Sequence, residues 1–197
     1  MLWLDGRKLG KDIEDMAMMV ASAGRDGVIE NETELDGRVC DCCQTSVAEV
    51  PEGLIAVYRD RSSDEVRDIS VIRYEGRRWS QPRTLAKDNC IIDACPVNGP
   101  SVSANGRNAV VAWFTEANGM PKVQAAFSKD SGKTFGAPVR LDEAMALGRV
   151  DAAMMPSGDA LVSWVDGDQG AHIRIRRIGA KGIKGPVLTV AATTTGL

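Results

Sequence analysis

The sequence has no excess of positive charge and no long hydrophobic run. Lys and Arg number 24 against 27 Asp and Glu, which gives a net charge of −3 and a pI near 5.3. A chain of this charge gives no electrostatic reason to bind DNA, RNA or an anionic membrane. No window approaches the ~18 consecutive apolar residues of a membrane span. We therefore expect neither nucleic acid nor membrane as a partner.

A signal peptide and a histidine cluster are also missing. The first residues, Met1–Gly6, have neither the basic end nor the apolar stretch of a signal peptide, so we expect a cytoplasmic protein as the chain is written. The single histidine, His172, is interpreted as an ordinary strand residue. No pattern in the sequence indicates a cofactor.

What the sequence does contain is an internal repeat. The chain has 197 residues and the composition of a globular protein, with 26% charged and 44% hydrophobic residues. An apolar strand that ends on a large aromatic recurs at Leu54–Tyr58, Ala109–Trp113 and Ala160–Trp164, with a remnant at Leu2–Leu4. Successive aromatic residues are 55, 55 and 51 residues apart. A period of this length is typical of propellers and other repeat folds.

Each repeat unit holds four predicted strands. A short strand and a turn come first, at Ser46–Val50, Ser101–Ser103 and Ala152–Met155. The aromatic strand is followed by an alternating segment, at Asp68–Arg73, Val123–Phe127 and His172–Arg176. A strand that begins near a proline ends the unit, at Gln81–Leu85, Ala137–Leu141 and Gly185–Leu188. Four antiparallel strands per unit form a propeller blade, because stacked blades bury faces that one blade alone would expose.

The repeat predicts an all-β fold, a β-propeller of about four four-stranded blades, three complete and one split or incomplete. We expect one domain over residues 1–197, with blades near 1–37, 38–92, 93–147 and 148–190 and a tail at 191–197. Residues 11–22 have helix-forming composition, but the repeat places Met16–Ala21 in a third strand. Residues 189–197 could add a first strand to the Trp3 blade, in the same chain or in a second copy, so a homodimer is one way to close the ring.

One segment matches the Asp-box pattern S-x-D-x-G-x-T-[W/F]. The matching residues are Ser128, Asp130, Gly132, Thr134 and Phe135. Ser, Asp and Thr side chains can bond backbone groups within a tight turn, glycine supplies a positive φ, and the aromatic fills the gap between sheets. The segment falls between a third and a fourth strand and resembles the Asp-box of sialidases and related propellers. We expect a structural role for it, because nothing in its turn chemistry requires a substrate.

A longer stretch resembles uncharacterised bacterial sialidase-like proteins. The resemblance covers Arg38–Asp166 and rests on Cys-Asp-Cys-Cys at Cys40–Cys43 and Asp-Ala-Cys-Pro-Val-Asn-Gly-Pro at Asp93–Pro100. It implies a partial propeller, since sialidase propellers have six blades, and full-length relatives could be exported. It also implies three arginines for the substrate carboxylate, a Tyr/Glu nucleophilic pair and an Asp acid. The sequence alone does not map that set onto this chain.

The turns between second and third strands are expected on one face, at the mouth of the propeller. This candidate ligand-binding face carries charged residues that could hold a glycan or a protein: Asp5, Arg7, Arg59, Asp60, Arg61, Glu116, Asp166 and Asp168. An arginine guanidinium can donate two parallel hydrogen bonds to one carboxylate. The segment Arg59-Asp60-Arg61 is therefore the first candidate for binding an acidic ligand. Two of the acids could serve as glycosidase acid and base. The alternative interpretation is solvated turn charge.

Five cysteines lie within one 56-residue stretch: Cys40, Cys42, Cys43, Cys90 and Cys95. The repeat places Cys40 and Cys95 at equivalent points of neighbouring blades, so a disulfide is conceivable if their Cα atoms approach within about 7 Å. A structural bridge or free thiols is the favoured interpretation. A soft-metal site for zinc or Cu(I) is the alternative, although Cys-x-Cys-Cys is not the usual zinc spacing.

Three functions follow from these patterns. The favoured hypothesis is a non-catalytic binding or interaction module for a glycan or a protein, because the catalytic set is not found. The second is a sialidase-like glycoside hydrolase whose site is completed by oligomerisation, since exposed sheet edges seek partners. The third is a truncated product without selected activity.

Overall fold

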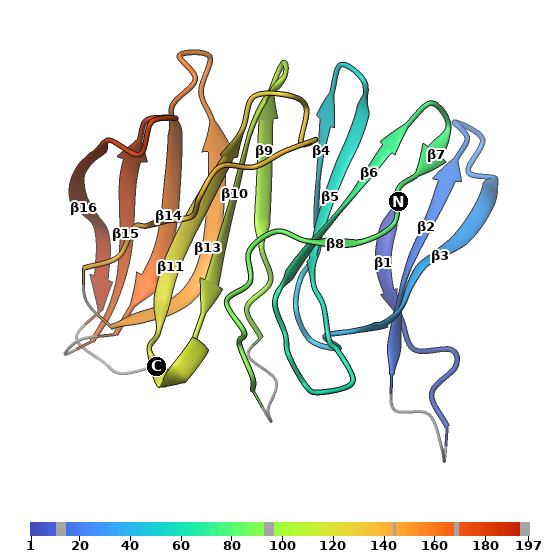
Figure 1. Ribbon diagram of the computed structural model, residues 1–197, viewed down its shortest axis with the longest axis horizontal. Helices are drawn as coiled ribbons and strands as arrows, with labels where there is room; N and C mark the ends of the chain where they lie inside the picture. The colour runs from blue at the N-terminus through green and yellow to red at the C-terminus, as the bar shows by residue number, and fades with distance from the viewer. Residues whose placement is uncertain (11–14, 93–96, 144, 168–169, 194–197) are drawn as a thin grey trace.

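The computed structural model describes residues 1–10, 15–92, 97–143, 145–167 and 170–193. These residues form four antiparallel sheets that stand side by side in a row (Figure 1). Among them, no helix is long and apolar enough to cross a membrane. The prediction of an all-β propeller with about four blades is confirmed.

The four sheets follow one another in chain order as blades 1 to 4. Blade 1 contains β1 (Leu2–Asp5), β2 (Met16–Ala23) and β3 (Ile29–Val39). Blade 2 contains β4 (Ser46–Val50), β5 (Gly53–Arg59), β6 (Ile69–Glu75), β7 (Arg78–Trp79) and β8 (Arg83–Thr84). Blade 3 contains β9 (Ser101–Asn105), β10 (Asn108–Thr115), β11 (Lys122–Ser128) and β12 (Val139–Arg140), with a short 3-10 helix η1 (Ala117–Gly119). Blade 4 contains β13 (Ala146–Met154), β14 (Ala160–Asp166), β15 (Ala171–Ile178) and β16 (Lys184–Thr193).

The segment with helix-forming composition is strand β2, as the repeat predicts. Its residues pair antiparallel with β1, for example Met19 with Trp3 and Met18 with Leu4. Met18 is fully buried against Tyr58 and Ile72 of blade 2. Burial of one face of β2 therefore outweighs its helical propensity.

Two expected blade boundaries fall inside strands and are corrected by the structure. The boundary at residues 37 and 38 lies within β3, which continues until Val39 pairs with Met16. The boundary at residues 147 and 148 lies within β13, which starts at Ala146 and carries two register shifts near Gly148. Bulges of this kind lengthen a strand beyond its regular apolar pattern, so the pattern alone places the start too late.

The core lies between the blades rather than within them. One buried cluster joins blades 1 and 2, a second joins blades 2 and 3, and a third joins blades 3 and 4. The repeated aromatics Tyr58, Trp113 and Trp164 are each at most 1% exposed. Serines on the inner strands connect neighbouring blades, since Ser46 Oγ accepts from Val102 N at 3.1 Å and Ser103 Oγ from Met154 N at 2.9 Å.

Blades 1 and 4 stand at opposite ends of the row (Figure 1). Completion of blade 1 by the tail of the same chain was one of the two alternatives for residues 189–197, but the described part of the tail pairs within blade 4, where β16 runs on to Thr193 opposite Ala171 of β15. Residues 189–193 thus extend blade 4, and residues 194–197 lie outside the described part. In blade 1 the described strands are ordered β1-β2-β3, which leaves β1 at the sheet edge.

Candidate functional site

The turns between second and third strands lie at one edge of the row, at the bottom of Figure 1. They include the β5–β6 loop, residues 60–68, and the β10–β11 connection with η1. The β4–β5, β9–β10 and β13–β14 hairpins lie at the opposite edge. The charged residues of the β5–β6 loop therefore gather with those that follow β3, at the bottom of blades 1 and 2.

Arg59 is not available to a ligand, which corrects its place on the candidate binding face. The residue is 2% exposed. Its guanidinium donates to three backbone carbonyls, Asn98 O at 2.9 Å, Arg67 O at 2.7 Å and Phe114 O at 2.6 Å. Because these carbonyls belong to three separate segments, Arg59 holds the loops at this edge together.

Asp60 lies beside Arg59 and also turns inward. Its carboxylate accepts from Ser70 Oγ at 3.0 Å and from the Arg61 amide at 2.7 Å. Burial and the nearby Asp36 carboxylate raise the pKa of Asp60. Tyr58 donates its hydroxyl to Asp36 at 2.6 Å, and burial raises the pKa of that phenol above its usual range.

Three arginines converge on one carboxylate at this edge. Glu65 accepts from Arg38 Nη2 at 2.8 Å, from Arg61 Nε at 3.0 Å and from Arg67 Nη2 at 2.9 Å. These charge-assisted contacts, with Arg61 the strongest, lower the pKa of Glu65 to about 2. We call Arg38, Arg61 and Arg67 the arginine cluster. It is the arrangement that a carboxylate ligand would require.

The three side chains of the arginine cluster differ in how much of their surface is exposed to solvent. The side chain of Arg67 is 7% exposed, that of Arg61 15% and that of Arg38 34%. Two further acids lie on the outer side: Asp15 is 3.6 Å from Arg61, and Asp41 is also 3.6 Å from Arg61. A ligand that approached from solvent would meet Arg38 and Arg61 first.

A strained turn presents Glu65 to the arginine cluster. Glu65 has φ 58°, in the left-handed region that non-glycine residues rarely adopt. The turn is closed by the Glu65 amide, which donates to Ser62 O at 3.1 Å, and by the Val66 amide, which donates to Ser62 Oγ at 3.1 Å. The ion pairs compensate for a conformation that costs of order 1 kcal/mol.

The other predicted face residues are dispersed over the remaining blades. Asp5 and Arg7 pair with each other on blade 1, where Arg7 holds the pKa of Asp5 below its usual range. Asp166, in blade 4, is buried and contacts Arg174 at 2.7 Å. Glu116 is exposed beside η1, and Asp168 lies outside the described residues. Among the described residues of the predicted set, the structure therefore brings Asp60 and Arg61 together in the β5–β6 loop and Asp5 and Arg7 together on blade 1, but it does not join these two pairs.

Sequence reasoning missed Arg38, Arg67 and Glu65. Arg38 is 27 residues from Glu65 and stands on a different blade. Glu65 and Arg67 belong to the same charged loop as Asp60 and Arg61, and this density of opposite charges was the available signal. It could not reveal which side chains turn inward.

Cys40 lies next to the arginine cluster, with its Sγ 3.7 Å from Arg67 Nη1. Cys40 Sγ is 2.7 Å from Cys43 Sγ and 3.9 Å from Cys42 Sγ, and all three sulfurs lie within 4.8 Å of one another. Cys42 is disulfide-bonded, so in this state it is not a thiolate ligand for a metal. Cys40, Cys43 and Cys90 are buried free thiols, and Cys95 lies outside the described residues.

The segment with the Asp-box pattern folds as a turn held by its own side chains. Asp130 accepts from the Thr134 amide at 2.8 Å and the Thr134 hydroxyl at 2.6 Å, and Ser128 Oγ accepts from the Gly132 amide at 2.8 Å. Gly132 has φ 75°, and a Cβ there would meet Ile55 Cδ1 at 2.6 Å. The turn therefore packs closely against Ile55 of blade 2.

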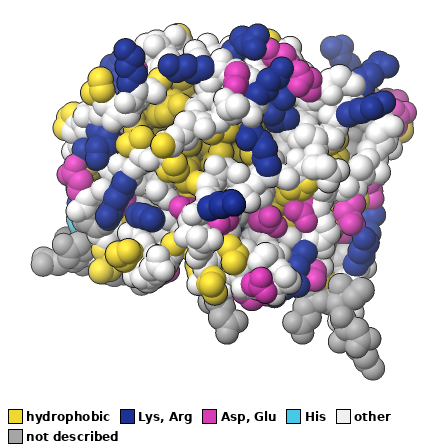
Figure 2. All heavy atoms as spheres, in the orientation of Figure 1, with side chains coloured by type: hydrophobic (Ala, Val, Ile, Leu, Met, Phe, Trp, Pro, Cys, Tyr) yellow, Lys and Arg dark blue, Asp and Glu magenta, His cyan; other side chains and the backbone are white. Residues whose placement is uncertain are grey.

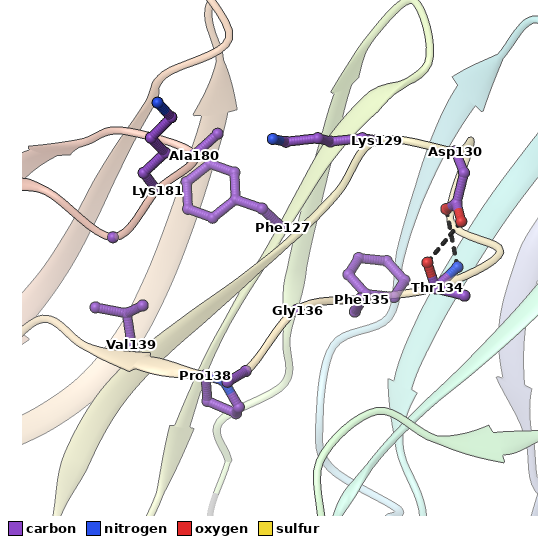
Figure 3. Close-up of a pocket in the computed structure, with 12 residues that line it drawn as sticks. Phe127, Lys129, Asp130, Thr134, Phe135, Gly136, Pro138, Val139, Ala180 and Lys181 are labelled. Carbon is purple, nitrogen blue, oxygen red and sulfur yellow. Dashed lines mark hydrogen bonds between the residues drawn. The ribbon is translucent and has the colours of Figure 1, made fainter.

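A groove lies beside this turn, on the side toward blade 4 (Figure 3). Phe127, Phe135 and Val139 line it, with Lys129 and Lys181 at its rim. Figure 2 shows hydrophobic side chains gathered over blades 3 and 4 on this face. The groove and the arginine cluster are separate surfaces, since the turn stands at the edge opposite to the β5–β6 loop.

Replacing Asp130 with alanine is expected to lower the free energy of unfolding by about 1–2 kcal/mol, because the Thr134 amide and hydroxyl lose their acceptor. Burial alone would raise the pKa of Asp130, but the Thr134 and Ser128 donors outweigh it and lower the pKa to about 2. The contribution is therefore present above the unfolded pKa of about 3.9 and lost as pH falls toward 2. Urea unfolding at pH 7 and pH 3 measures both effects. The exposed neighbour variant Lys129→Ala serves as control, and equal stability of the two variants at pH 7 would contradict the assignment.

Several solved structures similar to this chain are sialidases. No family model matches the chain, and no curated protein matches it. A Hadza microbial sialidase has a TM-score of 0.51 at 17% identity, over 91% of this chain and 44% of its own. A leech intramolecular trans-sialidase has a TM-score of 0.52 at 14% identity, over 92% of this chain and 30% of its own. The NanB sialidase of Streptococcus pneumoniae has a TM-score of 0.50 at 12% identity, over 87% and 27%.

The chain thus spans less than half the length of these sialidases. At these identities the likeness establishes the fold alone. The fold of this chain is that of a sialidase-like β-propeller.

Proposed function

We propose that this chain is a non-catalytic binding module that recognises a carboxylate-bearing glycan at the arginine cluster. The observation that carries the proposal is the convergence of Arg38, Arg61 and Arg67 on a single carboxylate, that of Glu65. Guanidinium forks match the geometry of carboxylates, and a partly buried cluster of three gives both affinity and orientation. Glu65 then holds the place that a ligand carboxylate would take.

The names of the similar proteins support the choice of ligand. They are named sialidases and a trans-sialidase, and sialic acid is a sugar that carries a carboxylate. A protein ligand would meet the same requirement through an aspartate or glutamate side chain. We favour a glycan because the likeness is to proteins that act on sugars.

The acids near the arginine cluster support binding rather than hydrolysis. A glycosidase needs two carboxyl groups that reach the scissile bond. Asp60 is turned toward Ser70, and Asp36 toward the Tyr58 hydroxyl. Asp15 and Asp41 are both paired with Arg61. Within the described residues, no carboxyl pair beside the cluster is free of such partners.

The test compares binding and turnover in the same samples. A trisaccharide with a terminal sialic acid is titrated calorimetrically into the unaltered chain and into Arg61→Ala, with released sialic acid measured in parallel. We expect saturable binding without release, and at least tenfold weaker binding by Arg61→Ala, about 1.4 kcal/mol. Arg78→Ala is the matched control, because Arg78 is an exposed arginine of blade 2 outside the cluster. Released sugar would instead establish a hydrolase, and equal binding by Arg61→Ala would exclude this site.

A further inference from the structure

The groove beside the Ser128–Phe135 turn combines an apolar floor with positive charge at its rim. Its volume is about 580 Å³, within the range of roughly 300–1,000 Å³ that small-ligand sites have. Phe127 lies on the floor and is 8% exposed, and Phe135 and Val139 are half-buried beside it. The β15–β16 turn, with Ala180, closes the other side (Figure 3). The groove is therefore built jointly by blades 3 and 4.

The two lysines at the rim come from different blades. Lys129 belongs to the turn after β11 in blade 3, and Lys181 belongs to the β15–β16 turn of blade 4. Both are exposed, and Figure 3 shows the side chain of Lys129 extending across the groove toward blade 4. Within the part of the chain that the structure describes, neither forms an ion pair or a hydrogen bond, whereas Lys133 of the same turn pairs with Glu75 at 3.1 Å. Both positive charges are therefore available to an anionic ligand.

The groove offers a ligand few other polar side chains. Besides the two lysines, the polar side chains that line it are those of Asp130 and Thr134. These two are already paired, since the Thr134 hydroxyl donates to Asp130 at 2.6 Å and the Thr134 amide at 2.8 Å. A sugar would leave hydroxyl groups without partners here, and polar groups that are buried without partners cost free energy. An apolar group flanked by negative charge matches the groove better.

A second hollow continues the groove along blade 4. It shares Lys129, Ala180 and Lys181 with the groove and reaches the β13–β14 hairpin at residues 157–159. An extended peptide spans up to about 3.3–3.6 Å per residue, so several residues can follow a path from blade 3 to blade 4. The length of this path favours a peptide over a single small acid.

We propose that the groove binds an acidic peptide segment of a partner protein. A large apolar side chain of the peptide packs on Phe127 and Phe135, and the flanking carboxylates pair with Lys129 and Lys181. Nucleic acid fits less well, because its affinity rests on many phosphate contacts and this chain has a net charge of −3. The site does not depend on glycan binding at the arginine cluster.

The experiment uses two peptides, acetyl-Asp-Glu-Phe-Glu-Asp-amide and the same peptide with serine in place of phenylalanine. Each is titrated calorimetrically into the unaltered chain at fixed, moderate salt, because exposed ion pairs are screened. We expect saturable binding of the phenylalanine peptide and at least tenfold weaker binding of the serine peptide, which buries less apolar surface on the floor of the groove. The double variant Lys129→Ala/Lys181→Ala should bind the phenylalanine peptide at least tenfold more weakly than the unaltered chain.

Two control variants keep the test decisive, because an acidic peptide could also bind at the arginine cluster. Arg61→Ala should bind the phenylalanine peptide with unaltered affinity. So should Lys87→Ala/Lys122→Ala, which removes two positive charges outside the groove. Weaker binding in either control would assign the peptide to the arginine cluster or to general electrostatics and would overturn the proposal. Absence of binding, equal binding of the two peptides, or unaltered binding by Lys129→Ala/Lys181→Ala would overturn it as well.

Discussion

Replacing Glu65 with glutamine is expected to strengthen binding of the sialic-acid trisaccharide about tenfold, or 1.4 kcal/mol. Glu65 accepts hydrogen bonds from all three arginines of the cluster, so in the unaltered chain a ligand carboxylate must displace it. Glutamine keeps the length of the side chain but removes its charge, and a neutral amide competes less well for guanidinium groups. The affinity is measured by calorimetric titration at fixed, moderate salt, because exposed ion pairs are screened.

Asp64→Asn is the matched control for this prediction. Asp64 is the neighbouring acid of the same loop and is exposed. Its substitution changes the net charge by the same amount as Glu65→Gln, so a general electrostatic effect would appear equally in both variants. Unchanged or weaker binding by Glu65→Gln would show that Glu65 does not occupy the ligand's place.

Replacing Arg59 with alanine is expected to have the largest effect on stability, a loss of about 3–5 kcal/mol. The substitution leaves the carbonyls of Asn98, Arg67 and Phe114 without their donor in a buried place, and it opens a cavity the size of the side chain. Arg59→Lys should recover part of the loss, because one ammonium cannot reproduce the planar fork. Urea unfolding monitored by tryptophan fluorescence gives the free energy.

Arg177→Ala is the control for Arg59→Ala. Arg177 is an arginine with a 57% exposed side chain that pairs with Asp159 on blade 4, and surface pairs of this kind contribute about 0–1 kcal/mol. A loss below about 1 kcal/mol in Arg59→Ala would mean that the three carbonyls find other donors or water.

The sequence predicts the blades well because their signal is local and repeated. The aromatic residues Tyr58, Trp113 and Trp164 recur with nearly constant spacing, and each is buried against the next or previous blade. The end of β3 and the start of β13 were misplaced because pairing continues there past the regular apolar pattern. Strand pairing depends on the partner strand, which a single strand's pattern does not contain.

The candidate site was predicted only in part, because it is assembled across blades. The sequence singles out Arg61, but Arg38 comes from β3 and meets Glu65 only after blades 1 and 2 pack. The direction of each side chain in the β5–β6 loop depends on its backbone, including the positive φ of Glu65. Arg59 and Arg61 are two residues apart and differ in role, since Arg59 is buried and Arg61 belongs to the arginine cluster, where it pairs with Glu65.

A crystal structure of the chain with the sialic-acid trisaccharide tests the central claim most directly. We predict that the sugar carboxylate lies between Arg38, Arg61 and Arg67, with Glu65 displaced from the arginines and the glycosidic bond intact. A trisaccharide bound elsewhere, for example in the groove beside the Ser128–Phe135 turn, with Glu65 still held by the three arginines, would contradict the account.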